Sequence, residues 1–295
     1  MKYPGIILLF ISFSLSSLGQ IIPFDYFGNP SPGDKIELFA PKMVSLQNSN
    51  EKSLAISPNG DEVFFSGGLD WPKCRIMHIK KANNQWSEPK VAEFSVDCYC
   101  TEPAFSPDGK YLYYSSSKGM QDINQYCIWR VEKVGSNWST PKKVIDIADP
   151  NILEFHPSVT KDGSVYFCSW NSQKQSGNIC KSKYYNNTYS EPEIIKLPFD
   201  VSGSNTDPFI DPDEKYLITS CSGQNSKGGY DVYISYMEKN GLWGVPVSLD
   251  ERFNTKEDDN SFDISPDGRY LFIYKQNDVY WTETKGLLLN LKPIK

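Results

Sequence analysis

The chain has 295 residues, and its 30 lysines and arginines against 36 aspartates and glutamates give a formal net charge of −6. Aromatic residues make up 14% of it, and glycine and proline number 20 each. A mildly acidic chain has no basic surface to neutralise phosphates, so the sequence argues against a nucleic-acid-binding protein. The length alone would suit two ordinary domains, but an internal repeat favours a single repeat domain.

The first residues predict a signal peptide. Lys2 precedes an apolar run over residues 6–11, and the small residues Ser17 and Gly19 fit a cut before Gln20. This run is too short for a comfortable membrane span, and no later segment approaches that length. We expect residues 1–19 to be removed and residues 20–295 to form one domain. The mature chain would be exported, periplasmic or secreted, with no membrane span.

One short motif recurs along the chain at a spacing of roughly 50 residues, which is typical of repeat architectures. In its fullest form, residues 106–109 read Ser-Pro-Asp-Gly and precede the apolar run 111–114. Proline presets φ, aspartate bonds its own backbone and glycine accepts positive φ, so the motif predicts a tight turn before a strand. The other copies are residues 57–60, 161–163, 211–214 and 265–268.

Each repeat has four predicted strands. In the second repeat they include residues 103–105 before the turn, 111–114 after it, 128–131, and a last one near Pro141. Proline is tolerated in an outermost strand, where its missing N–H faces solvent. Four-stranded antiparallel units repeated radially make a β-propeller, in which each blade is covered on both faces. We therefore expect an all-β propeller of antiparallel blades.

A strand of the outermost type also stands at residues 38–44, with no turn or strand before it. Such a leftover strand can complete the last repeat, so we predict a ring closed by the N-terminal strand. Five blades are favoured because five turns are present. The tail at residues 287–291 could itself form a strand or a short helix, which leaves six blades as the alternative.

The repeats resemble the TolB-like, WD-like propeller family, whose signature is a Pro-Asp-Gly turn before a Tyr/Phe-rich strand. The likeness extends over nearly all of the mature chain. It departs at Asn59, which replaces aspartate, at residues 161–163, which lack the proline, and at Glu214, which replaces glycine. The resemblance implies the propeller fold. It implies no single function, because the family includes periplasmic interaction modules, propeller domains of peptidases and exported proteins of unassigned role.

Aligning the repeats on their turns places polar residues at two levels of the first strand, which lines the channel of a propeller. One level holds Ser53, Glu102, His156, Asp207 and Ser261, and the level two positions earlier holds Glu51, Cys100, Glu154, Asn205 and Asp259. The alignment predicts one ring of acidic and hydrogen-bonding groups at the channel mouth. Such a ring could bind calcium or a polar ligand, or it could only cap the strands and solvate a water-filled channel. The candidate ligand-binding residues are Glu51, Glu102, Glu154, His156, Asn205, Asp207 and Asp259.

The long connections between repeats gather at the end of the ring opposite the Ser-Pro-Asp-Gly turns. Long loops on a rigid scaffold often carry binding sites, so this loop end is the expected functional face. Trp71 and Trp170 lie there, near the acidic residues, and could stack on sugar rings or simply pack against loop backbone. No cofactor other than calcium is expected.

Familiar enzyme motifs are mostly missing: the sequence has no Gly-x-Ser-x-Gly elbow, no His-Glu-x-x-His and no phosphate-cradling loop. The favoured interpretation is an exported non-catalytic propeller that binds a protein or glycan through its loop end. The alternative is a hydrolase or lyase acting on an extracellular polysaccharide or peptide. Glu102 and Asp207, or Glu154, would then be the acids.

The chain has seven cysteines, all expected near the loop end. Export permits disulfides, and Cys168 and Cys180 lie on neighbouring predicted strands, so they are the candidate disulfide. Cys98 and Cys100 with two further thiols could instead bind zinc. An odd number of cysteines leaves at least one thiol unpaired in a monomer.

Overall fold

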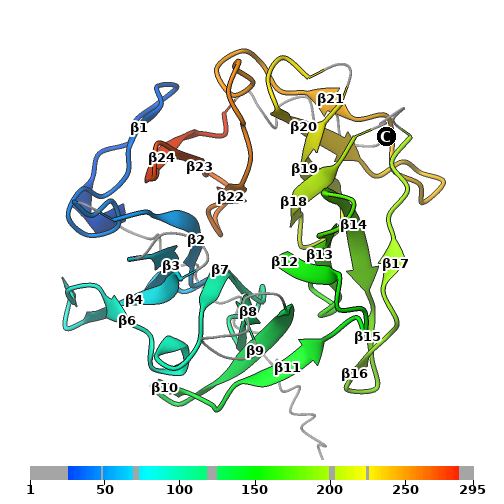
Figure 1. The fold of residues 1–295 in the computed structure, drawn as a ribbon. Helices are drawn as coiled ribbons and strands as arrows, with labels where there is room; N and C mark the ends of the chain where they lie inside the picture. The colour runs from blue at the N-terminus through cyan, green and yellow to red at the C-terminus, as the bar shows by residue number, and fades with distance from the viewer. Residues whose placement is uncertain are drawn as a thin grey trace, which may run out of the picture.

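The computed structural model describes residues 26–47, 49–68, 73–117, 125–198, 203–223 and 226–285. In these residues the only helical elements are two short 3-10 turns, η1 (Tyr26–Gly28) and η2 (Glu93–Ser95). The strands form five antiparallel sheets arranged as blades around a central axis, plus one short hairpin (Figure 1). The predicted all-β propeller is confirmed, with five blades rather than six.

Each blade begins with its strand nearest the axis and proceeds outwards along the chain. The innermost strands are β2 (Lys52–Ile56), β7 (Cys100–Phe105), β12 (Ile152–Val159), β18 (Asn205–Ile210) and β22 (Phe262–Ile264). The second strands are β3 (Glu62–Gly67), β8 (Tyr111–Ser117), β13 (Val165–Asn171), β19 (Tyr216–Ser222) and β23 (Tyr270–Lys275). The third strands are β4 (Arg75–Ala82), β9 (Tyr126–Val134), β14 (Ser176–Ser182), β20 (Tyr230–Tyr236) and β24 (Asp278–Glu283).

The outermost strands are short. They are β6 (Lys90–Val91), β11 (Lys142–Ile145), β17 (Glu193–Ile194), β21 (Val247–Ser248) and β1 (Glu37–Leu38). Small hairpin strands accompany three blades: β5 (Gln85–Trp86), β10 (Asn137–Trp138), and the pair β15 (Tyr184–Tyr185) and β16 (Thr188–Tyr189). In each blade the innermost strand contacts those of both neighbouring blades, so the five of them enclose the axis.

The N-terminal strand β1 closes the ring, as predicted. It pairs antiparallel with β24, with Glu37 opposite Trp281 and Leu38 opposite Tyr280. The Phe39 N–H continues the pairing by donating to the Val279 carbonyl at 2.8 Å. Blade 5 therefore takes its outermost strand from the start of the domain and its other three from the end.

The Ser-Pro-Asp-Gly motifs form the predicted turns between the first and second strands. Ser106 Oγ donates to Asp108 at 2.6 Å and accepts from the Tyr111 N–H at 2.9 Å. Gly109 has a φ of +71° and donates its N–H to the Ser106 carbonyl. In blade 4, Glu214 replaces the glycine and is held at a φ of 57°, a conformation that costs a residue with a side chain some strain.

Five apolar clusters fill the gaps between neighbouring blades, one at each interface. Successive residues of a strand point to opposite faces, so Phe65 packs against blade 5 while Phe64 packs against blade 2. Both are fully buried. This two-sided packing explains why the second strands are continuously apolar instead of alternating.

No helix in the described part of the chain is long and apolar enough to cross a membrane. The predicted signal peptide, residues 1–19, lies outside the described residues.

Candidate functional site

Five polar residues occupy equivalent places on the inner strands and share an unusual backbone. Their φ angles are 44°, 57°, 54°, 50° and 59° for Ser53, Glu102, His156, Asp207 and Ser261 in that order. In four of the blades the ladder between the first and second strands shifts register at or beside this residue, as in a β-bulge. Left-handed backbone at such residues costs roughly 1–3 kcal/mol each and is often found where a protein builds a site. The shared geometry singles out this level of the channel.

The bulges turn backbone N–H groups towards the preceding blade. Glu102 donates its N–H to Ser66 Oγ of blade 1 at 2.7 Å. His156 donates its N–H to Ser115 Oγ of blade 2 at 3.2 Å and to Glu102 Oε2 at 2.7 Å. These bonds fix the inner strands against one another, so the side chains at this level are held on a rigid base.

Glu102, His156 and Asp207 come together at the axis, and we call them the central cluster. His156 Nδ1 lies 3.7 Å from Glu102 Oε1 and 3.5 Å from Asp207 Oδ1. One ligand atom from each residue lies within 4.8 Å of the other two. The His156 side chain is only 4% exposed, whereas those of Glu102 and Asp207 are 18% and 14% exposed. Solvent therefore reaches the two carboxyl groups, while the imidazole lies behind them.

The central cluster shifts its members' pKa values in different directions. Burial alone would lower the pKa of His156, but the adjacent carboxylates of Glu102, Asp207 and Asp263 raise it to about 9. Burial also opposes ionisation of Glu102, yet the adjacent His156 imidazole and the hydrogen bonds from the His156 N–H and Ser115 Oγ prevail and lower its pKa. For Asp207 burial prevails over the attraction of His156, so its pKa is raised. At neutral pH the imidazole is charged, Glu102 is ionised, and Asp207 holds its proton more tightly than an ordinary aspartate.

A cavity of about 550 Å³ lies on the axis, lined by inner strands and by Ser-Pro-Asp-Gly turns. Its polar lining includes Asp263, whose Oδ2 accepts from Tyr274 Oη at 2.5 Å and from the Leu54 N–H at 3.1 Å. Sequence reasoning missed Asp263, although a signal existed. It lies two residues after the aligned level, where the other repeats have Ala55, Ala104, Ser158 and Phe209. A lone carboxylate among small and apolar residues marks a departure from the repeat.

This cavity lies at the turn end of the ring, whereas the sequence favoured the loop end as the functional face. Several of the long connections lie partly outside the described residues, including 69–72, 118–124 and 199–202. Trp71 is among them. Trp170 lies in β13 opposite Leu153 and Gly177, and it is not among the residues that line this cavity.

The second predicted level is separate from the central cluster, which corrects the expectation of one ring. Glu51, Glu154 and Asp259 are 0%, 1% and 3% exposed, and their carboxylates accept hydrogen bonds from backbone N–H groups of the connection before the strand. The bulge between the two levels breaks the alternation of side chains and explains the split. Burial raises the pKa of Glu51, and it raises that of Glu154 to about 7. Asn205 also lies outside the central cluster, with a buried Oδ1 that accepts no hydrogen bond from the described residues.

The predicted Cys168–Cys180 disulfide is wrong, because both thiols are free. Cys168 is paired opposite Ile179, and Cys180 is paired opposite Phe167, so the two side chains project from opposite faces of the sheet. The structure instead joins Cys98 to Cys100. That bond also removes these two sulfurs from the zinc site considered as an alternative.

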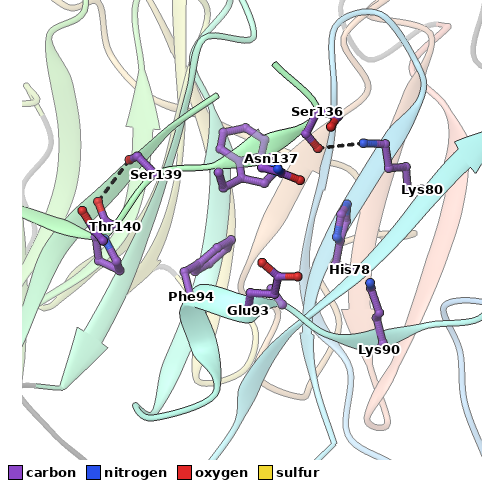
Figure 2. A pocket seen from close by; sticks show the side chains of 12 residues that line it. His78, Lys80, Lys90, Glu93, Phe94, Ser136, Asn137, Ser139 and Thr140 are labelled. Atoms are coloured by element: carbon purple, nitrogen blue, oxygen red, sulfur yellow. Dashed lines mark hydrogen bonds between the residues drawn. The ribbon is translucent and has the colours of Figure 1, made fainter. Parts of the chain in front are cut away.

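A smaller cavity, of about 340 Å³, lies between blades 1 and 2 away from the axis. Figure 2 shows His78, Lys80 and Lys90 on one side of it, with Phe94 and Glu93 opposite, and Lys80 Nζ donating to the Ser136 carbonyl at 2.9 Å. Beneath its wall, His78 stacks on Phe64 with ring centroids 4.2 Å apart.

The His78 Nε2 atom lies 3.3 Å from Oε1 of Glu62, a fully buried carboxylate that also pairs with Lys133 of blade 2. Burial opposes ionisation of Glu62, but the adjacent His78 and the hydrogen bond from Lys133 prevail and lower its pKa to about 2. His78 therefore belongs to an ion-pair network that joins two blades.

No protein-family model matches the chain, and the search of curated proteins found no match. The TolB-like resemblance therefore remains a prediction, while the propeller fold that it implied is confirmed. The fold is similar to that of a thermostable family-43 glycoside hydrolase, with a TM-score of 0.51 and 12% identity over 81% of this chain and 91% of that one.

Two further solved structures are similar at lower scores. A gluconolactonase from Xanthomonas campestris has a TM-score of 0.45 and 10% identity, over 81% of this chain and 86% of that one. One of two prolyl endopeptidases described together has a TM-score of 0.44 and 12% identity over 79% of this chain, which spans only 32% of its length. At 12% identity, the likeness to the family-43 glycoside hydrolase concerns the fold and says nothing about activity.

Proposed function

We propose that this protein is a hydrolase that cleaves glycosidic bonds in an extracellular polysaccharide, and that the central cluster carries the reaction. The observation that supports this most is the pair of carboxyl groups at the axis whose pKa values are shifted apart. The pKa of Glu102 is lowered and that of Asp207 is raised, although both carboxyl groups lie beside the same imidazole. Two neighbouring carboxyl groups whose pKa values are shifted in opposite directions suit the acid–base cleavage of a glycosidic bond.

In this proposal Asp207 is the general acid. Burial disfavours its charged form and raises its pKa, so it is the better suited of the two acids to carry a proton, which it would donate to the leaving oxygen. Glu102 is the ionised partner that attacks the anomeric carbon. An oxygen of Glu102 and one of Asp207 lie within 4.8 Å, close to the roughly 5–5.5 Å at which a carboxylate acts as a nucleophile. The spacing favours a retaining reaction, in which water then releases the sugar from Glu102.

His156 is a positioning residue here. The Nδ1 atom of its buried imidazole lies 3.7 Å from Glu102 and 3.5 Å from Asp207, and its backbone N–H donates to Glu102 Oε2. Ser115 Oγ donates to the same Glu102 oxygen at 2.9 Å. With these donors in place, Glu102 keeps one orientation, which a nucleophile requires.

The choice of glycosidic over peptide bonds follows from the groups at the axis. Peptide cleavage by an activated serine, cysteine or metal-bound water needs donors for an oxyanion, and aspartic proteases share one proton between two carboxylates about 3 Å apart. The central cluster instead has a carboxyl pair with the imidazole of His156 beside both acids. The axial cavity of about 550 Å³ begins just beyond this cluster, at Pro103, Pro157 and Phe209, and its lining does not include Glu102, His156 or Asp207.

The non-catalytic alternative would use the same groups to hold a glycan or a protein without turnover. Opposed pKa shifts favour catalysis over this role, because a pure binding site gains nothing from one proton held tightly and another released. The calcium hypothesis has less support, because the charged His156 already supplies a positive charge between the two carboxyl groups. It predicts that millimolar calcium raises the melting temperature, and that replacing Glu102 and Asp207 together abolishes this effect.

The test is a panel of extracellular polysaccharides incubated with the purified protein and with the variants Glu102→Gln and Asp207→Asn. We expect new reducing ends from at least one polymer, and a loss of at least about 100-fold in rate for each variant. Glu93→Gln is the matched control, because this exposed carboxylate lines the other cavity and should leave the rate unchanged.

Three outcomes would contradict the proposal: glycan binding without turnover, unsaturated products typical of a lyase, or a rate that survives both axial substitutions.

A further inference from the structure

Three side chains of types that bind metal ions meet where blade 2 joins blade 3. Cys127 lies in β9, Asp146 directly follows β11, and Glu154 lies in β12. One ligand atom from each, a thiol sulfur and two carboxylate oxygens, lies within 4.8 Å of the other two. None of the three belongs to the central cluster, so whatever they bind is independent of the proposed hydrolysis.

One carboxylate oxygen of Glu154 in this group has no hydrogen-bond partner among the described residues. Its side chain is 1% exposed, and its Oε1 accepts a hydrogen bond from the Ile147 N–H. Its Oε2 is buried and accepts no hydrogen bond from the described residues. A carboxylate oxygen in that situation is costly, and native proteins rarely leave one without a proton donor or a cation. The nearby ammonium of Lys143 is engaged by Asp146 Oδ2 and does not supply it.

We propose that Cys127, Asp146 and Glu154 form a binding site for a divalent ion of the zinc class. Zinc accepts thiolate at about 2.3 Å and carboxylate oxygen at about 2.0–2.2 Å, which in a tetrahedral site places sulfur and oxygen about 3.6 Å apart. Cys127 Sγ and Asp146 Oδ1 already lie 3.2 Å apart. A thiol among the ligands selects against calcium and magnesium, which prefer oxygen alone.

Binding would exchange a proton for the metal. The Cys127 S–H bond breaks, the proton goes to solvent, and the thiolate forms the bond to the ion. Cys127 is 3% exposed and Glu154 is 1% exposed, whereas Asp146 lies at the surface. The ion would enter beside Asp146, and a water would take the fourth position. Because its ligands come from both blades, the ion would link blade 2 to blade 3.

Cobalt(II) is the probe, because it occupies zinc sites and absorbs in the near ultraviolet when a thiolate binds it. We expect tag-free protein to develop this thiolate-to-cobalt band with one equivalent of cobalt, and zinc to abolish the band by displacement. Cys127→Ser should remove the band. The matched control is Cys180→Ser, which replaces another buried free thiol outside the group and should retain it.

Glu154→Gln keeps the shape of the side chain and removes its charge, so it serves if Cys127→Ser does not fold. It should weaken cobalt binding at least tenfold, since changes merely adjacent to metal ligands cost about 10–100-fold. The proposal is overturned if the unaltered protein gives no band, if the band persists in Cys127→Ser, or if Glu154→Gln binds cobalt as tightly as the unaltered protein.

Discussion

The two histidines of the chain each lie beside a carboxylate, yet the charges that surround the two pairs differ. His78 pairs with Glu62 at 3.3 Å, and the same carboxylate also has Lys80 and Lys133 within 4.0 Å. His156 pairs with Glu102 and Asp207, and a third carboxylate, that of Asp263, adds to its field. In the outer network two lysines lie beside one fully buried carboxylate, whereas in the central cluster one imidazole lies among several carboxyl groups.

That difference decides what each pair can do. In the outer network the cations hold Glu62 ionised well below neutral pH, so no proton is exchanged and the network only joins blades. In the central cluster one imidazolium cannot neutralise all the carboxyl groups, and burial raises the pKa of Asp207. The His78–Glu62 pair therefore stabilises the contact between two blades, whereas the carboxyl groups beside His156 are suited to proton transfer.

The largest expected effect separates the two regions by activity. Glu102→Gln should lower the rate on a cleaved polysaccharide by about a thousandfold, because the variant cannot attack the anomeric carbon. His78→Gln alters the other pair and should leave the rate within about twofold. Initial rates of reducing-end release measure both. A loss of activity in the His78 variant comparable to that in the Glu102 variant would erase the distinction between the two regions.

A smaller effect concerns pH. The folded pKa of His156, about 9, lies above the unfolded value of 6.5, so its contribution to stability is fully present below pH 6.5. That contribution is lost as the pH rises through about 9, and it amounts to something on the order of 3 kcal/mol. Urea unfolding should show stability falling between pH 6.5 and 9, and His156→Gln should flatten this fall. Equal slopes for the two proteins would mean that His156 is not held charged.

The smallest effect is on stability at neutral pH. Glu62→Gln leaves His78 and Lys133 without their buried partner, and it should lower the free energy of unfolding by about 2 kcal/mol, less than a fully buried pair because Lys133 is 24% exposed. Glu102→Gln removes one of several competing carboxylates and should change stability by less than about 1 kcal/mol. Denaturant midpoints of the two variants provide the comparison, and the reverse order would contradict it.

The fold could be predicted because every repeat carries the same turn and the same apolar strand. The N-terminal strand was predictable for a related reason: residues 38–44 match the outermost strands and have no repeat of their own. The equivalence of Glu102, His156 and Asp207 could also be predicted, because aligning the repeats on their turns places these residues at the same position of the innermost strand.

The sequence could not predict which side chains at the axis face one another. Residues two apart on a regular strand share a face, so Glu51 and Glu154 would have pointed the same way as Ser53 and His156. The bulges break this alternation, and both carboxylates are buried away from the central cluster. The same limit applies to Cys168 and Cys180, whose adjacency along neighbouring strands says nothing about the register that separates their faces. Asp263 was missed because it lies outside the aligned levels.

The most direct measurement is an NMR titration of the two imidazole rings, which is simple because the chain contains only two histidines. His78→Gln assigns the signals by removing one of them. We predict that the His156 ring remains protonated at pH 8 and titrates near pH 9, held charged by the carboxyl groups around it. Titration of His156 at or below its ordinary pKa of about 6.5 would contradict the account, because the central cluster would then hold no charged imidazole between its acids.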